Sequence, residues 1–215
     1  MQAALTLAHH LDRWEARLRR VGESLGWPQA WLREFQGYLN QPRMTLEEFW
    51  VRYTLKRIAA EPLWKETMTE AEARAFYQAT DYLLWRQVVH RRHASWRRVL
   101  HTMRGRRGLL LEFGCGIAPV STWASPRKPG WHYTLEDLDS ASWRYALTRI
   151  SRRSPLARDV PGPYDVIVVL DVFEHLADPE GAARALVARL SPGGYLHWNA
   201  VESAAAAYLN LATRE

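Results

Sequence analysis

Hydrophobic residues in the second half of the chain form short runs separated by longer amphipathic segments. Residues 109–113 and 164–170 are largely apolar, as is typical of strands buried on both faces of a parallel sheet, whereas residues 132–137 alternate apolar with polar positions. A helix is expected over about residues 179–190, followed by a Ser-Pro-Gly-Gly turn at residues 191–194 and a last strand at residues 195–201. Another helix should begin near Ser140, and its apolar face comprises Trp143, Ala146, Leu147 and Ile150. These alternating elements predict an α/β fold with a doubly wound, mostly parallel sheet.

The first half of the chain has a helical pattern throughout. Apolar residues recur at three- and four-residue steps over residues 7–21, and Pro28 is placed to open a second helix. Capping boxes at Thr45 and Thr69 predict the starts of the third and fourth helices. The last helical stretch is expected to break near residue 80 and to reach about residue 103.

Charge changes close to the point where the helical pattern ends. Residues 1–108 contain 19 Lys and Arg against 11 Asp and Glu, whereas residues 109–215 contain 10 against 12. The formal net charge of +6 therefore comes from the first half. We expect two parts: an all-helical region over residues 1–104 and an α/β core over residues 105–215.

Residues 112–116, Glu-Phe-Gly-Cys-Gly, follow the first strand with a Gly-x-Gly turn. Glycines allow a tight turn whose backbone amides approach a ligand closely, so the turn predicts a nucleotide-like cofactor. A dinucleotide fingerprint would have a third glycine where Pro119 stands, and a phosphate loop would supply Gly-Lys-Ser/Thr. Neither is present, which leaves Glu112 as an acceptor for a cationic amine or a hydroxyl. A turn without a ligand is the alternative.

Asp137 ends the second strand about 20 residues after the glycines, where an acid binds ribose hydroxyls in a βαβ nucleotide site. The other interpretation is that Asp137 caps the next helix, a role open equally to Asp139 and Ser140. The sequence leaves both open.

Five segments resemble, in order, the motifs of class I S-adenosylmethionine-dependent methyltransferases, especially the branch with ubiquinone, menaquinone and many natural-product enzymes. They are residues 112–116, Asp137, residues 159–161 (Asp-Val-Pro), residues 164–175 and residues 190–194 (Leu-Ser-Pro-Gly-Gly). The resemblance spans residues 105–201. It implies a Rossmann-like fold, S-adenosyl-L-methionine as cofactor, and methyl transfer as the activity.

The resemblance also implies roles for single residues. Glu112 and the glycine turn would hold the methionine part of the cofactor, Asp137 its ribose and Asp159 its adenine amino group, while Asp171 would lie near the transferring methyl. Each has a local alternative, such as a plain turn role for Asp159. The implied cofactor-binding set is Glu112, Phe113, Gly114, Cys115, Gly116, Asp137, Leu138, Asp159, Val160 and Asp171.

His175 is the candidate catalytic residue. Methyl transfer from a sulfonium mainly requires alignment of the reacting groups, but a phenol, hydroxyl or amine acceptor is helped by a general base near neutrality. His175 lies beside Glu174, just after the apolar run of residues 164–170. The alternative is that both residues merely begin the next helix.

Several chemistries are disfavoured. Cys115 is the one cysteine and lies within the turn, which argues against a cytosine C5-type nucleophile, an intrachain disulfide and a cysteine-rich metal cluster. The eight histidines show no paired-ligand spacing, so no metal is expected. Residues 170–173 lack the Asn/Asp-Pro-Pro-aromatic segment of adenine and protein-glutamine N-methyltransferases.

The first half raises two further interpretations. Seven of the 11 tryptophans fall there, at spacings typical of a helical core, although N-terminal helices of related enzymes commonly form a lid whose aromatic residues line an acceptor pocket. Basic residues over residues 90–107, interleaved with aromatic ones, suit the binding of RNA or an acidic substrate, but a solvated basic face is the commoner outcome for such a cluster.

No apolar run is long enough for a transmembrane helix and residues 1–21 lack the apolar segment of a secretory signal, so the cytoplasm is expected. The C-terminal strand pair of the family has no counterpart before residue 215, so we expect a sheet of about five strands with an open edge. A second copy in a homodimer, a partner subunit or the N-terminal helices could cover that edge.

The leading functional hypothesis is methylation of a small-molecule O, N or C nucleophile. The alternatives are an RNA methyltransferase, a non-catalytic partner subunit and, more distantly, an NAD oxidoreductase.

Overall fold

The computed structural model describes residues 28–63, 68–90, 96–105, 107–152 and 161–199. Contacts divide the chain into two compact units, residues 1–58 and residues 59–215. The sequence placed the start of the α/β core near residue 105. In the structure the helices of residues 70–102 belong to the same compact unit as the sheet.

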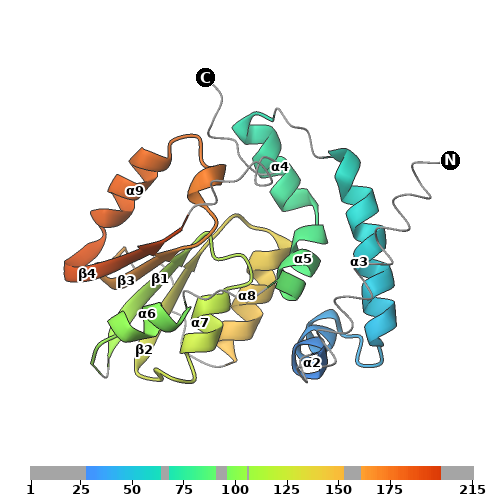
Figure 1. Ribbon diagram of the computed structural model, residues 1–215, viewed down its shortest axis with the longest axis horizontal. Coiled ribbons are helices and arrows are strands. Elements are labelled where there is room, and N and C mark those ends of the chain that lie inside the picture. The colour runs from blue at the N-terminus through green and yellow to red at the C-terminus, as the bar shows by residue number, and fades with distance from the viewer. Residues whose placement is uncertain (1–27, 64–67, 91–95, 106, 153–160, 200–215) are drawn as a thin grey trace. The chain divides into compact units, whose positions relative to one another are not determined.

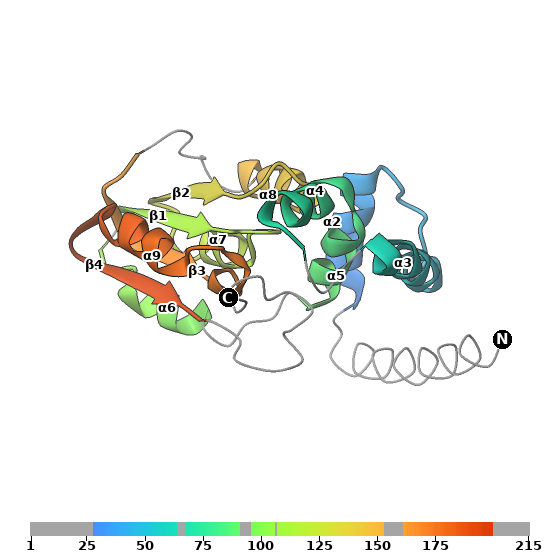
Figure 2. The same cartoon turned by 90° about the horizontal axis from the view of Figure 1, so that it is seen from above.

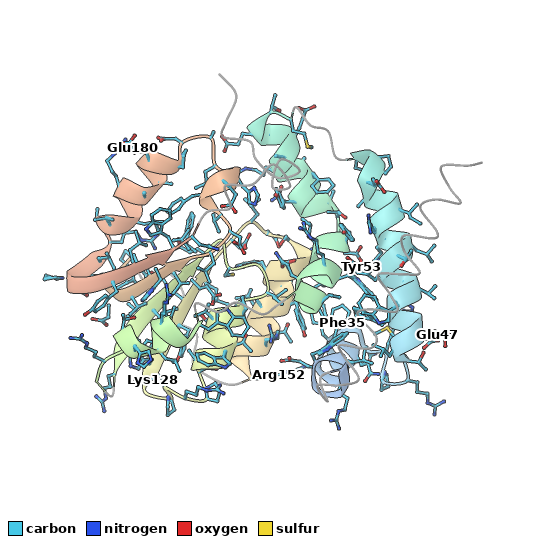
Figure 3. All side chains as sticks on the ribbon, viewed as in Figure 1. Phe35, Glu47, Tyr53, Lys128, Arg152 and Glu180 are labelled. Atoms are coloured by element: carbon cyan, nitrogen blue, oxygen red, sulfur yellow. The ribbon has the colours of Figure 1, made fainter. Side chains whose placement is uncertain are left out.

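The first unit holds α2 (Pro28–Leu39) and most of α3 (Leu46–Ala60). The predicted capping box opens α3, because the Thr45 N–H donates to Glu48 Oε2 (2.7 Å) and the Glu48 N–H donates to Thr45 Oγ1 (3.1 Å). Phe35, labelled in Figure 3, is fully buried and meets Phe49 edge-on at 5.8 Å between ring centroids. Trp31 packs on the same ring at 4.9 Å. Aromatic residues therefore form the core of this unit, as their spacing predicts.

The second unit contains the sheet and the remaining helices. Its elements are η1 (Glu61–Leu63), α4 (Glu70–Ala79), α5 (Tyr82–His90), α6 (Trp96–Thr102), β1 (Gly108–Phe113), α7 (Pro119–Ala124), β2 (Trp131–Glu136), α8 (Ala141–Ser151), β3 (Tyr164–Val169), η2 (Phe173–His175), α9 (Pro179–Val187) and β4 (Leu190–Trp198). The capping box at Thr69 opens α4, and the expected break near residue 80 separates α4 from α5. None of the helices in the described ranges is long and apolar enough to cross a membrane.

The four strands of the described residues run parallel in the order β2-β1-β3-β4 (Figures 1 and 2). The sequence predicted about five strands. Residues 153–160, with Asp159 and Val160, lie outside the described residues, as do residues 200–215, where the family's last strand pair was expected to be missing. The proposal that a second copy or a partner subunit covers a sheet edge stays a prediction.

Side chains of alternate strand residues build two apolar layers. Leu110, Val166 and Val168 pack with α6, α7 and α8 on one face. Leu111, Ile167 and Val169 pack on the other face, which α9 covers (Figure 1). Helices on both faces of a parallel sheet confirm the predicted doubly wound, Rossmann-like fold.

The last strand differs from its expectation. The sequence predicted a turn at residues 191–194 followed by a strand, but β4 begins at Leu190, which pairs with Tyr164. The next pair joins Val166 to Tyr195, so the turn residues form an irregularity inside the strand. A Cβ on Gly194 would lie 3.0 Å from the Tyr164 carbonyl oxygen, so a glycine is needed where the two backbones approach.

Candidate active site

A cavity of about 740 Å³ lies at the carboxyl ends of β1, β2 and β3. It is walled by the glycine turn after β1, the residues after β2, the loop after β3, and helices α4, α5 and α6. The chain leaves β1 for β2 on one side of the sheet and returns to β3 on the other, and open α/β sheets bind ligands at such a switch point. Eight of the residues singled out in the sequence line this cavity: Phe113, Gly114, Cys115, Gly116, Asp137, Leu138, Asp171 and His175.

The glycine turn is shaped by its neighbours. Gly114 and Gly116 have φ values of +62° and +50°, and a Cβ on Gly114 would lie 2.3 Å from a methyl carbon of Val172. The N–H groups of Gly114 and Cys115 donate to the Glu136 carbonyl oxygen at 2.8 and 3.2 Å. The turn therefore needs glycine both for its conformation and for its packing.

The Gly116 N–H is also used within the protein, since it donates to Asp137 Oδ2 at 2.5 Å. Three successive amides of the turn thus point to the end of β2. A role for these amides as donors to a ligand stays a prediction. A pyrophosphate would need such donors, so the geometry agrees with the missing phosphate motifs.

Asp137 is half-buried at the wall of the cavity. Its Oδ1 accepts the Leu138 N–H at 2.6 Å. Burial raises the pKa of Asp137, and the backbone hydrogen bonds from Gly116 and Leu138 oppose that shift. Ser140 caps α8 through a hydrogen bond from the Trp143 N–H (3.2 Å), so the structure assigns the cap to Ser140 and not to Asp137. A carboxylate has roughly four lone-pair sites, which leaves Asp137 able to accept hydrogen bonds from a ligand.

Glu112 lies behind the turn and does not line the cavity. It is 3% exposed, and its two oxygens accept the N–H groups of Val120 (3.1 Å) and Ser121 (2.7 Å) at the start of α7. The residue before this helix, Ala118, has no side-chain cap to offer, so Glu112 supplies it from the strand. Burial raises the pKa of Glu112 to about 7. A contact between Glu112 and the cofactor stays a prediction; the observed contacts support a positioning role.

The thiol of Cys115 is buried, and burial raises its pKa well above the usual range. It is therefore protonated at neutral pH and unsuited to act as a nucleophile.

The backbone after the glycine turn is held by Arg149, a buried side chain whose Nη1 donates to the Ile117 carbonyl oxygen at 2.7 Å.

The loop after β3 is tied to the end of β4. The Asp171 N–H donates to Asn199 Oδ1, and Asn199 Nδ2 donates back to Asp171 Oδ1, both at 2.7 Å. Asp171 has a φ of +56° and lines the cavity. This reciprocal pair holds Asp171 in a left-handed conformation that non-glycine residues adopt infrequently.

His175 lies on the short turn η2, ahead of α9, and faces the cavity together with Tyr77 of α4. Their ring centroids are 6.3 Å apart with the planes tilted by 48°. Burial raises the pKa of Tyr77, with further increases from Glu174 and Asp137 and an opposing effect of Arg86. The Tyr77 hydroxyl is therefore protonated at neutral pH and can donate a hydrogen bond.

One face of α4 was missed by the sequence reasoning. The residues of this face that line the cavity are Glu70, Ala73, Arg74 and Tyr77. Their spacing of three and four residues places them on one side of the helix, and this period was the available signal. Arg86 and Gln87 of α5 and Trp96 of α6 complete the wall, while Trp85 is a core residue at 2% exposure.

Two other expectations stay predictions. The described residues contain no group of three or more His, Cys, Asp and Glu side chains placed to hold a metal. The basic segment considered for RNA binding includes residues 91–95, which lie outside the described residues.

Comparison with protein families identifies the family of this chain. A family model described as "Methyltransferase domain" matches residues 88–208. The ubiquinone biosynthesis O-methyltransferase of Bordetella pertussis is 33% identical over 101 residues, 42% of this chain and 41% of that protein. That of Chromobacterium violaceum is 35% identical over 54 residues, 25% of this chain and 23% of that protein. An uncharacterized protein of a Synechococcus species is 28% identical over 100 residues, 41% of this chain and 24% of that protein.

These matches span from about a quarter to two fifths of the length of the relatives. Among solved structures, coclaurine N-methyltransferase bound to N-methylheliamine and SAH aligns with a TM-score of 0.45 and 16% identity, covering 91% of this chain and 63% of that one. The family model covers more than half of the chain, including β1 to β4 and the glycine turn. The chain therefore belongs to the methyltransferase domain family, in the class I S-adenosylmethionine-dependent group that its motifs indicate.

Proposed function

We propose that the protein transfers a methyl group from S-adenosylmethionine to an O, N or C nucleophile of a small molecule. The observation that carries this proposal is that one cavity is lined by two sets of residues. The glycine turn, Asp137 and Asp171 form the set matched to the cofactor, and Tyr77 and His175 form a second set suited to an acceptor. The cavity volume, about 740 Å³, falls within the range of roughly 300–1,000 Å³ seen for small-molecule sites.

The residues present fit S-adenosylmethionine better than a dinucleotide. Asp137 would accept hydrogen bonds from the ribose hydroxyls, and Leu138 and Phe113 add apolar surface to the same wall. The amides of residues 114–116 already donate to the end of β2, so they are unsuited to a pyrophosphate. When bound, the cofactor supplies a methyl group activated by its sulfonium sulfur.

The acceptor side needs a group that takes a proton from the attacking hydroxyl, phenol or amine. His175 is the candidate, because an imidazole accepts a proton near neutral pH and its ring lies at the cavity wall. The protonated hydroxyl of Tyr77 can donate a hydrogen bond that orients the acceptor. The names of the relatives from Bordetella pertussis and Chromobacterium violaceum favour an oxygen nucleophile.

Calorimetric titration tests the cofactor assignment. We expect wild-type protein to bind S-adenosylmethionine and S-adenosylhomocysteine, and we expect Asp137→Ala to lose most of that affinity while keeping its circular dichroism spectrum. A screen of phenols, alcohols and amines for S-adenosylhomocysteine release then identifies the acceptor class. Absence of cofactor binding by folded wild-type protein would reject the proposed function.

A further inference from the structure

The side chain of Gln87 lies directly over the glycine turn. Gln87 belongs to α5 and lines the same cavity as Gly116 and Asp137. A Cβ built on Gly116 would lie 2.7 Å from Gln87 Nε2, 2.8 Å from Oε1 and 2.9 Å from Cδ. The amide group is therefore packed flat against Gly116, on the turn that the sequence associates with the methionine part of the cofactor.

The amide oxygen of Gln87 has no hydrogen-bond donor within the described part of the chain. Oε1 is buried, and no residue in the described ranges donates a hydrogen bond to it. Buried polar atoms nearly always have a partner in native proteins. Because Gln87 Oε1 belongs to a residue of the cavity wall, we expect a ligand in the cavity to supply its hydrogen-bond donor. The last side-chain torsion of glutamine is soft, so the oxygen can turn toward the cavity while α5 stays in place.

Two groups of the cofactor can donate: the ribose hydroxyls and the ammonium of the methionine part. The carboxyl oxygens of Asp137 line the cavity and can accept hydrogen bonds from the ribose. The ammonium has three N–H donors and needs acceptors near the glycine turn. Arg86, the residue before Gln87, also lines the cavity, and its positive charge suits the carboxylate of the methionine part of the cofactor. Helix α5 thus presents one group complementary to the ammonium of the methionine part and one complementary to its carboxylate.

We propose that Gln87 is a cofactor-binding residue whose side-chain oxygen accepts a hydrogen bond from the ammonium group of S-adenosylmethionine. This inference rests on the proposed function, since it requires that cofactor in the cavity. It extends the cofactor site to α5, beyond the residues that the motifs indicate.

The test compares two ligands that differ only at the amino acid end. S-adenosylhomocysteine carries the ammonium, whereas 5′-methylthioadenosine has the same nucleoside and sulfur without it. We expect Gln87→Leu to weaken S-adenosylhomocysteine binding roughly 10- to 100-fold, as for loss of a hydrogen bond to a charged group, and to leave methylthioadenosine binding unchanged. Gln87→Glu keeps an acceptor and should keep the affinity for S-adenosylhomocysteine. The matched control is Gln78→Leu, at an exposed position of α4 outside the cavity.

Four results overturn the inference, and they are distinguishable. Unchanged S-adenosylhomocysteine binding by Gln87→Leu, or an equal loss for both ligands, rejects the ammonium contact and leaves the proposed function standing. Wild-type protein that binds neither ligand rejects the proposed function and the inference together. If Gln87→Leu fails to fold, Gln87→Glu decides, because its loss of S-adenosylhomocysteine binding with methylthioadenosine binding retained contradicts an acceptor role.

Discussion

The carboxylate of Glu112, on β1, accepts the backbone N–H of Ser121 on α7 at 2.7 Å. The two residues stand nine positions apart, on either side of the glycine turn. Negative charge at a helix N-terminus is favoured by the helix dipole and by unpaired N–H groups. The acid that precedes the turn therefore fixes the helix that follows it, and the turn is held between two elements joined by one side chain.

The burial of Glu112 predicts a pH dependence of stability, because burial raises the pKa of this carboxyl while the hydrogen bonds from Ser121 and Val120 oppose that shift. The folded-state pKa of Glu112 is about 7, above its ordinary value of 4.5, so the folded protein binds this proton more tightly than the unfolded chain does. Its contribution to stability is full below pH 4.5 and is lost as the pH rises to about 7, by up to about 3 kcal/mol. Urea unfolding of wild-type protein and Glu112→Gln at pH 5 and pH 7.5 measures this. We expect the wild-type stability to fall more steeply, and parallel slopes would contradict the assignment.

Asp137 predicts a pH dependence of cofactor affinity. Its ionised form accepts hydrogen bonds, and burial raises its pKa. Affinity for S-adenosylhomocysteine should therefore rise with pH as this carboxyl ionises, and Asp137→Asn should bind roughly 10- to 100-fold more weakly with a flatter profile. Calorimetry from pH 5 to pH 8 gives both curves. An Asn variant that follows the wild-type profile would show that another group titrates.

Replacement of Gly114 and of Gly116 by alanine should lower the free energy of unfolding by unequal amounts. Both have positive φ, so alanine costs roughly 1–2 kcal/mol at each. At Gly114 the new methyl also meets the stiff side chain of Val172 at 2.3 Å, whereas at Gly116 it meets the flexible end of Gln87 at 2.7 Å. We expect Gly114→Ala to lower the free energy of unfolding by roughly 1–3 kcal/mol more than Gly116→Ala does. Denaturant titration measures the difference.

A second substitution serves as the control for that comparison. Val172→Ala removes the obstructing methyl groups, so Gly114→Ala combined with Val172→Ala should lose less stability than the sum of the two single changes. Additive losses would mean that the Val172 contact is not the cause.

Substitution of His175 tests the general base proposed for the acceptor substrate. We expect His175→Gln to lower kcat by roughly 10²- to 10⁴-fold, as for loss of a general base, with little change in cofactor affinity. Tyr77→Phe should have a smaller effect, chiefly on the KM of the acceptor, because the hydroxyl orients the acceptor without taking its proton. Steady-state kinetics with the acceptor from the screen separates these effects. Retention of the wild-type kcat by His175→Gln would remove the base assignment.

Local features of the fold were predictable because their signals are local. The apolar runs that became β1 and β3, the capping boxes at Thr45 and Thr69, and the glycine turn each depend on residues within one element. Backbone preference and side-chain period act over a few residues. The position of Asp137 at the end of β2 followed from the same kind of signal.

Tertiary structure decided the relationships between elements. In the folded protein Ser140 caps α8, and the N–H groups of the glycine turn donate to the end of β2. Glu112 accepts hydrogen bonds from the start of α7, and the amide of Gln87 packs on Gly116. Tertiary structure also turned the expected Ser-Pro-Gly-Gly turn into an irregularity of β4. By itself the sequence determined which residues form strands, helices and the turn, because propensity and periodicity are properties of short segments. The partner of each polar group depends on which segments the packed core brings together, and that is decided only when the chain folds.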